Sequence, residues 1–212
     1  LDALKLGLPI GGTVFAEVAI FSGVGLVMSK YPSLVIASHQ AAMNFSNLMY
    51  AFPLSISSAM AIIISYEFGA RRMDAVKSYS KLGRLTALGF SIFTLIFLYF
   101  LRYDLAELYG HEPDFLRMTA IFMTYSLFFQ VADVFAAPLQ GILRGYKDTK
   151  VPFYLGILTY WGITLPVGFL LEKVTGLGPY SYWIGLITSL IVSGLCYQWR
   201  LNRIVKRYES QQ

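Results

Sequence analysis

Residues 6–28 read LGLPIGGTVFAEVAIFSGVGLVM, a run in which Glu17 is the single ionisable side chain. A stretch of about 20 apolar residues is long enough to cross the hydrocarbon layer of a bilayer, about 30 Å thick, as one α-helix. Strands of a transmembrane barrel would instead be segments of about ten residues with strict alternation of polarity, which this run lacks. The stretch therefore predicts a membrane-spanning helix.

Five more apolar runs follow along the 212-residue chain, and connections with charged residues separate them. Run 34–66 contains Pro53 and is too long for one straight crossing, so we expect a kinked helix whose C-terminal end projects into water. The chain is thus predicted to be an all-α, multi-pass membrane protein with one six-helix unit over residues 1–212. The five further spans are 34–66, 84–101, 116–142, 151–171 and 181–199.

The composition supports a membrane protein and excludes two other classes. Charged residues make up 14% of the chain, against about 25% in soluble domains, and the mean hydropathy is +0.57. A water-soluble enzyme could not cover its surface with so few charges. A disulfide-built secreted domain is excluded because Cys196 is the one cysteine. The net charge of +5 does not indicate nucleic-acid binding, since the basic residues form short clusters instead of one basic face.

The distribution of the 17 lysines and arginines predicts the orientation in the membrane. Basic residues concentrate in cytoplasmic connections, and an even number of spans puts both termini on one side. Four basic residues fall on the other side, where the connection 102–114 is acidic. We therefore expect a multi-pass protein of the cell (inner or plasma) membrane with both termini in the cytoplasm. The thirteen basic residues on the predicted cytoplasmic side are Lys5, Arg71, Arg72, Lys77, Lys81, Arg84, Arg144, Lys147, Lys150, Arg200, Arg203, Lys206 and Arg207.

Two acidic residues, Glu17 and Asp133, lie deep inside predicted spans. A charged side chain there costs at least about 2.5–3.5 kcal/mol, so such groups face protein or trapped water and are functional candidates by default. Counted from the same side of the membrane, their depths differ by only about 1–2 Å at 1.5 Å per residue. Two carboxylates at one level can share a cation such as Na⁺, or a proton. The alternative is a neutral carboxyl that hydrogen-bonds to a neighbouring helix.

Polar and small residues follow one face of the fourth span, at helical spacing around Asp133. In the second span, Gln40, Asn44 and Asn47 have the same spacing, next to His39, which we interpret as a packing residue. Such side chains either line a cavity or join helices through hydrogen bonds. We assign Gln40, Asn44, Asn47, Phe129 and Gln130 to a substrate cavity, because rings and amides beside carboxylates suit bulky organic cations. The residues on the face of the fourth span are Ser126, Gln130, Asp133, Ala137 and Gln140.

Three segments resemble one family of transporters. They are LKLGLPIGGTVFAEVAIFS at 4–22, IASHQAAMNFSNLMYAFPLSISSAMAIIISYEFGAR at 36–71, and QVADVFAAPLQGILRGYKDTKVPF at 130–153. The family is that of the multidrug and toxic compound extrusion (MATE) transporters, and the resemblance is closest to its bacterial NorM-type branch. It covers essentially the whole chain as spans seven to twelve of a twelve-helix protein. The expected fragment, which begins at Leu1 instead of Met, is thus a C-terminal lobe with an N-terminal six-helix lobe as its partner.

The resemblance implies secondary active efflux of cationic amphiphilic drugs or dyes by alternating access, in antiport with Na⁺ or H⁺. It matches Glu17 and Asp133 to the carboxylates of the C-lobe cation site. Some members carry a tyrosine where this chain has Phe129, so the hydroxyl of that position is missing here. No cofactor beyond the coupling ion and no metal beyond a Na⁺ at these acids is expected, and no catalytic set indicates an enzyme.

Two alternatives remain open from the sequence. A flippase of lipid-linked sugars from the same superfamily would need cations for a pyrophosphate in its cavity, whereas the charges predicted at mid-membrane are acidic. A channel or a membrane scaffold would use the acids to line a pore or to join helices. A channel would pass current without drug exchange, and a scaffold would tolerate neutralised acids.

Overall fold

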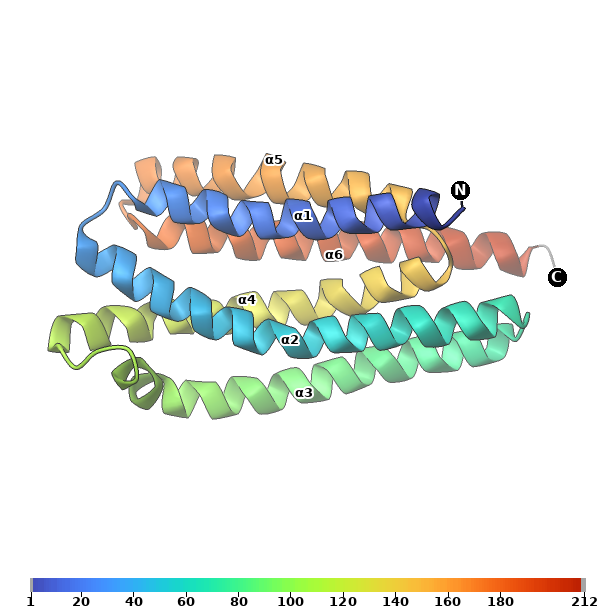
Figure 1. Ribbon diagram of the computed structural model, residues 1–212, viewed down its shortest axis with the longest axis horizontal. Coiled ribbons are helices and arrows are strands. Elements are labelled where there is room, and N and C mark those ends of the chain that lie inside the picture. Colours follow the sequence, from blue (N-terminus) through green and yellow to red (C-terminus); the bar gives the residue numbers. More distant parts are fainter. Residues whose placement is uncertain (1, 211–212) are drawn as a thin grey trace.

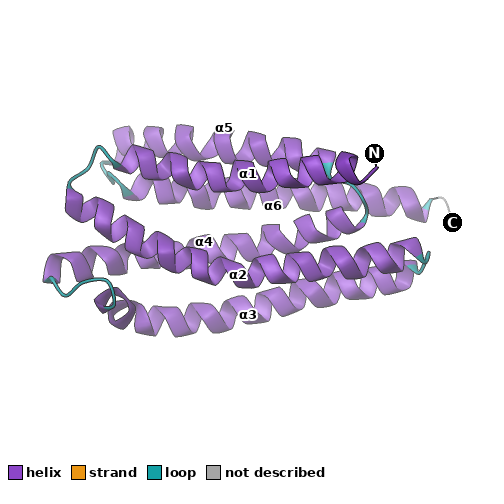
Figure 2. Ribbon diagram, viewed as in Figure 1, coloured by secondary structure: helices purple, strands orange, loops and turns teal. Residues whose placement is uncertain are grey.

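The computed structural model describes residues 2–210, which form six α-helices joined by short connections (Figures 1 and 2). Each predicted run lies within one of these helices, and all six are long and apolar enough to cross a membrane. The predicted all-α fold with six spanning helices is confirmed. The helices are α1 (Asp2–Met28), α2 (Ser33–Gly69), α3 (Met73–Glu107), α4 (Pro113–Gly145), α5 (Lys150–Thr175) and α6 (Tyr180–Glu209).

Helix α3 is much longer than the apolar run 84–101 inside it. Its 35 residues extend over about 52 Å at 1.5 Å per residue, well beyond a hydrocarbon layer of about 30 Å. A charged residue ends an apolar run in the sequence, but the backbone hydrogen bonds of the helix continue through polar turns. The added turns at its start, residues 73–83, therefore extend the helix past the apolar layer.

Helix α2 has 37 residues, with Pro53 in its interior, and it changes direction along its length (Figure 1). Proline lacks the amide hydrogen and crowds the preceding turn, so an interior proline bends a helix. The helix ends at Gly69, and just beyond it Arg72 Nε lies 2.8 Å from a carboxylate oxygen of Glu67. This ion pair ties the polar C-terminal end of α2 to the connection that follows.

Helix α4 is the central helix of the bundle, since α2, α3 and α6 all pack against it. Helix α5 packs on α6, and α1 packs mainly on α5 and only lightly on α2. The contact of α4 with α2 is especially close at Gly141, where a Cβ atom would lie 2.8 Å from Ser57 Cα. Glycine is therefore required there for the two backbones to approach, and this approach fixes one side of the site described below.

The connections gather at two opposite ends of the bundle (Figure 1). One end holds residues 70–72 and 146–149, together with the start of α1 and the end of α6. We call it the basic end, because the thirteen basic residues counted above lie in or near these segments. The opposite end holds the other three connections. The start of α1 and the end of α6 thus lie on one side of the bundle, as an even number of spans requires.

A cluster at the opposite end joins the α1–α2 connection to α5 and α6. Lys30 Nζ lies 2.6 Å from Glu172 Oε2 and donates to the Tyr182 hydroxyl at 3.0 Å, while the Tyr31 and Tyr182 hydroxyls donate to the same carboxylate. Partial desolvation opposes the charge of Lys30, but its bonds with Glu172 and Tyr182 outweigh this and hold the Lys30 pKa above its usual value. Because that pKa is raised, the stabilisation that depends on the Lys30 charge is complete at neutral pH and is lost as the pH rises into strong alkali.

We expect Lys30→Met and Glu172→Gln each to lower the free energy of unfolding by about 1 kcal/mol, because the ammonium group is partly solvent-screened. The double variant should lose less than the sum of the two, since both changes break the same bridge. Thermal unfolding of the purified protein in detergent measures all three values. Strict additivity would mean that the ion pair contributes nothing.

Candidate cation-binding site

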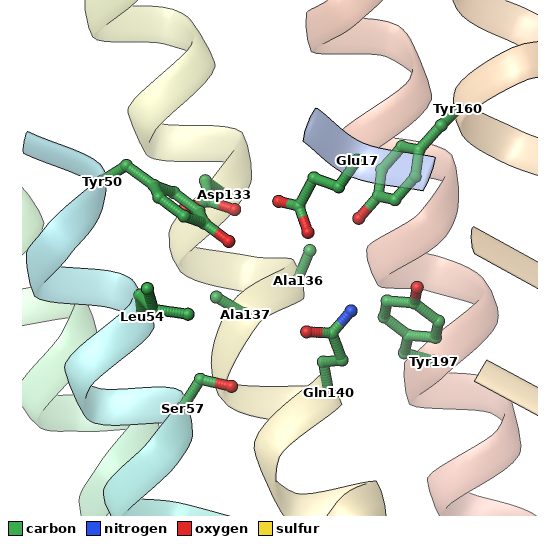
Figure 3. Close-up of a pocket in the computed structure, with 10 residues that line it drawn as sticks. All are labelled: Glu17, Tyr50, Leu54, Ser57, Asp133, Ala136, Ala137, Gln140, Tyr160 and Tyr197. Carbon is green, nitrogen blue, oxygen red and sulfur yellow. The ribbon is translucent and has the colours of Figure 1, made fainter. Parts of the chain in front are cut away.

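Glu17 of α1 and Asp133 of α4 meet in one small pocket with a cavity volume of about 10 Å³, which is room for about one water molecule (Figure 3). Both carboxylates are buried, at 6% and 3% exposure. Helices α1 and α4 pack against other helices and scarcely against each other, so the two side chains extend across the space between them. We call this space the carboxylate pocket. Its lining consists of Glu17, Tyr50, Leu54, Ser57, Asp133, Ala136, Ala137, Gln140, Tyr160 and Tyr197.

Three tyrosines, from three different helices, surround the two acids. Tyr50 of α2 lines the pocket and directs its hydroxyl toward the acids (Figure 3). Tyr160 of α5 directs its hydroxyl into the pocket (Figure 3), and Tyr197 of α6 lines the pocket and donates its hydroxyl to the Pro152 carbonyl oxygen at 3.4 Å. Sequence reasoning did not assign these tyrosines to the site. One signal was available, because Tyr160 stands in the middle of run 151–171, far from either membrane surface.

The wall toward the basic end is polar. Gln140 of α4 lines the pocket, and its Oε1 accepts a hydrogen bond of 2.8 Å from Arg144 one turn later. Arg144 lies in the last turn of α4, where a positive charge favours carboxylates nearby. Gln140 thus lines the same pocket as the buried acids and is also held by a basic residue close to the end of the helix.

Several buried polar atoms have no hydrogen-bond partner among the residues that the structure describes. They include Asp133 Oδ2 and Ser57 Oγ, both in the carboxylate pocket. Unpaired buried acceptors are costly and call for an explanation. Within residues 2–210, no group of three or more His, Cys, Asp or Glu side chains is arranged to hold a metal ion. A cation in this pocket would instead have two carboxylates with hydroxyl and amide oxygens as its ligands, the ligand type of small hard cations.

The three amides assigned to a substrate cavity on α2 lie elsewhere. Gln40, Asn44 and Asn47 are exposed and do not line the carboxylate pocket. They precede Tyr50 by one to three turns and so lie nearer the opposite end of the bundle. The structure does not bring them together with the two acids.

Phe129 and Gln130 of α4 are both buried, and neither lines the pocket. The ring of Phe129 packs edge-on against Phe21, with centroids 5.5 Å apart, and against Trp183 at 6.4 Å. The Nε2 atom of Gln130 is another buried group without a partner among the described residues. These two side chains belong to the interior of the bundle here.

His39 has the packing role that we expected. It is 1% exposed, and its Nδ1 accepts a hydrogen bond of 3.1 Å from the indole nitrogen of Trp183. Its ring also packs edge-on against Phe122. The histidine therefore joins α2 to α6 inside the bundle, away from the carboxylate pocket.

Comparison with known proteins agrees with the fold. Residues 9–170 match the MatE family, which is well over half of the chain. The chain belongs to the MatE family. The resemblance to MATE transporters noted in the sequence is thereby confirmed.

The MatE relatives include a probable multidrug resistance protein NorM from Streptococcus pneumoniae, 67% identical over 209 residues. That alignment covers 99% of this chain and 46% of the relative, so the chain spans about half the length of the curated relatives that it matches.

Solved structures with the same fold include the eukaryotic MATE transporter AtDTX14, with a TM-score of 0.86 and 17% identity over 93% of this chain and 45% of that one. The MATE transporter ClbM in complex with Rb⁺ has a TM-score of 0.86 and 16% identity, over 98% and 47% of the two chains. At these identities the likeness concerns the fold alone.

Proposed function

We propose that this chain is one lobe of a secondary active exporter that expels cationic amphiphilic drugs in antiport with Na⁺ or H⁺. A second six-helix lobe would complete the transporter, because the chain spans about half of its relatives. The observation that carries the proposal is the convergence of Glu17 and Asp133 in one buried pocket. No chemical reaction and no cofactor beyond the coupling ion are part of it.

The carboxylate pocket offers a physical route to coupling. Two like charges in a buried space repel each other, and a bound cation removes that repulsion. Helix α1 packs mainly on α5, so its position relative to α4 depends on few other contacts. A cation that draws Glu17 toward Asp133 would therefore favour one arrangement of α1. Such differential affinity for two conformers is what transport coupling requires. The complex of ClbM with Rb⁺ supports a monovalent cation in a protein of this fold.

The exposed amides of α2 support a substrate path beside this pocket. Gln40, Asn44 and Asn47 lie on a helix long enough to span a membrane, and polar side chains are unfavourable in contact with lipid tails. We propose that they face a cavity shared with the second lobe, where they would contact the drug. Phe129 and Gln130 would then act from the interior, by holding the shape of the wall around Asp133.

The charge distribution supports an orientation with the basic end in the cytoplasm. Basic connections remain on the cytoplasmic side during insertion, and the start of α1 and the end of α6 lie at the basic end. The coupling ion would then enter from the opposite end, down its gradient, and reach Glu17 and Asp133 between the helices.

The test is efflux of a cationic dye from proteoliposomes that contain the complete twelve-helix protein, under an imposed Na⁺ gradient, an imposed pH gradient, or neither. We expect one of the two gradients to accelerate efflux over the rate in protein-free vesicles, and the effective gradient identifies the ion. Equal rates in all three conditions would refute drug antiport. Ionic current without dye exchange would indicate a channel instead.

A further inference from the structure

A groove between α3 and α6, at the basic end, has no part in the proposed transport cycle. Helix α4 forms its floor, because α3 and α6 each pack against α4 and scarcely against each other. Two adjoining pockets make up the groove, with cavity volumes of about 440 Å³ and 290 Å³, and Arg84 and Gln198 line both. We call it the α3–α6 groove.

The groove changes from polar to apolar along its length. Lys77 of α3 and Lys206 of α6 line the part nearest the basic end. Leu85 and Leu88 of α3, with Phe135 of α4, line the deeper part. From Lys77 to Leu88 the helix rises about 16 Å, which reaches from the level of lipid head groups well into the acyl chains.

All charged side chains that line the groove are basic: Lys77, Lys81, Arg84 and Lys206. Arg84 reaches across from α3, where its Nε donates to the Ser80 carbonyl oxygen at 3.2 Å and its Nη1 to Gln198 Oε1 of α6 at 3.3 Å. The guanidinium is thus held over the junction of the polar and apolar parts. A planar guanidinium with neighbouring lysines is well suited to a phosphate group.

We propose that the α3–α6 groove binds one anionic phospholipid from the leaflet at the basic end. The phosphate lies against Arg84 and Lys206, and an acyl chain lies along Leu85, Leu88 and Phe135. Basic pockets between membrane helices attract anionic head groups, and the apolar extension selects a lipid over a soluble phosphate. The bound lipid bridges α3 and α6, which pack scarcely against each other and are joined directly by the Arg84–Gln198 hydrogen bond. This site is separate from the carboxylate pocket and does not depend on cation coupling.

The test uses the complete protein reconstituted in vesicles of phosphatidylcholine with a minor fraction of phosphatidylglycerol. Native mass spectrometry after mild solubilisation counts the phosphatidylglycerol molecules that the protein retains. We expect wild type to retain one tightly bound molecule and the variant Arg84→Gln/Lys206→Gln to bind it at least about tenfold more weakly. The control Arg203→Gln/Arg207→Gln also removes two positive charges at the basic end, both from α6 and both outside the groove, and should bind as wild type does.

A second variant tests the apolar part of the groove without a change of charge. Leu88→Trp fills the path of the acyl chain and should also lose the bound phosphatidylglycerol, while its melting temperature remains that of wild type. If the first variant fails to fold, Leu88→Trp carries the test alone. If Leu88→Trp still retains phosphatidylglycerol, the proposal is overturned. It is also overturned if glycerol phosphate displaces the lipid. Either result would favour a soluble phosphate as the ligand. Equal losses of bound phosphatidylglycerol in Arg84→Gln/Lys206→Gln and in Arg203→Gln/Arg207→Gln would mean that only diffuse electrostatic attraction holds the lipid. That result would also overturn the proposal.

Discussion

Neutralising either buried acid, by Glu17→Gln or Asp133→Asn, is expected to lower gradient-driven dye export by about 5- to 150-fold, the usual range of coupling between two sites. Both side chains line the carboxylate pocket and are almost completely buried. Each substitution therefore removes one of the two charges that would bind the cation. Efflux from proteoliposomes, normalised to the amount of inserted protein, measures the effect.

Glu67→Gln provides a matched control for this prediction. It makes the same chemical change at another buried glutamate, which pairs with Arg72 outside the carboxylate pocket. Loss of a partly exposed ion pair costs at most about 1 kcal/mol of stability, so export should remain near the wild-type rate. If both pocket variants export as well as this control does, the two acids are structural.

Gly141→Ala is expected to lower the free energy of unfolding by about 1–3 kcal/mol, the usual cost of overpacking. The added Cβ would meet backbone atoms of Ser57, which cannot rotate away as a side chain could. Because Ser57 lines the carboxylate pocket, separation of α2 from α4 should also weaken cation binding. Thermal unfolding in detergent and efflux under the effective gradient measure the two effects.

Gly89→Ala is the control for the packing prediction, since a Cβ at this α3 position meets no atom within 4 Å. We expect its melting temperature to equal or exceed that of wild type, because alanine is the better helix former. A wild-type melting temperature for Gly141→Ala would show that α2 and α4 can separate at little cost.

The number of helices follows from the sequence because each crossing needs a long apolar run, and six such runs are present. Their lengths do not follow so directly. Run 84–101 predicts half of α3, which extends from Met73 to Glu107. Hydropathy reports the part that lipid can cover, whereas a helix ends where its backbone hydrogen bonds end. The predicted runs are therefore minimum lengths.

The two acids were predictable because a charge deep in an apolar run has few structural explanations. Matching depths on two helices made it possible that they meet, and the structure places both in one pocket. The tyrosines were not predictable in this way, since tyrosine is also common where a helix meets the membrane surface. Tyr50, Tyr160 and Tyr197 come from three helices whose packing order is a tertiary property.

Helical spacing alone also failed to separate two parts of α2. Asn47 and Tyr50 are neighbours on the helix, yet Asn47 is exposed and Tyr50 lines the carboxylate pocket. Helix α1 packs only lightly on α2, so the amides nearer the opposite end are not covered within this lobe. Their assignment to a substrate cavity remains a prediction that concerns the second lobe.

The central claim is that Glu17 and Asp133 bind the coupling cation together. Infrared difference spectroscopy of the complete protein tests it most directly, with spectra recorded before and after addition of the effective ion. We predict carboxyl or carboxylate bands that respond to the ion in wild type and in Glu67→Gln, and that disappear in Glu17→Gln/Asp133→Asn. Unchanged bands in the double variant would contradict the claim and would assign the cation to other residues.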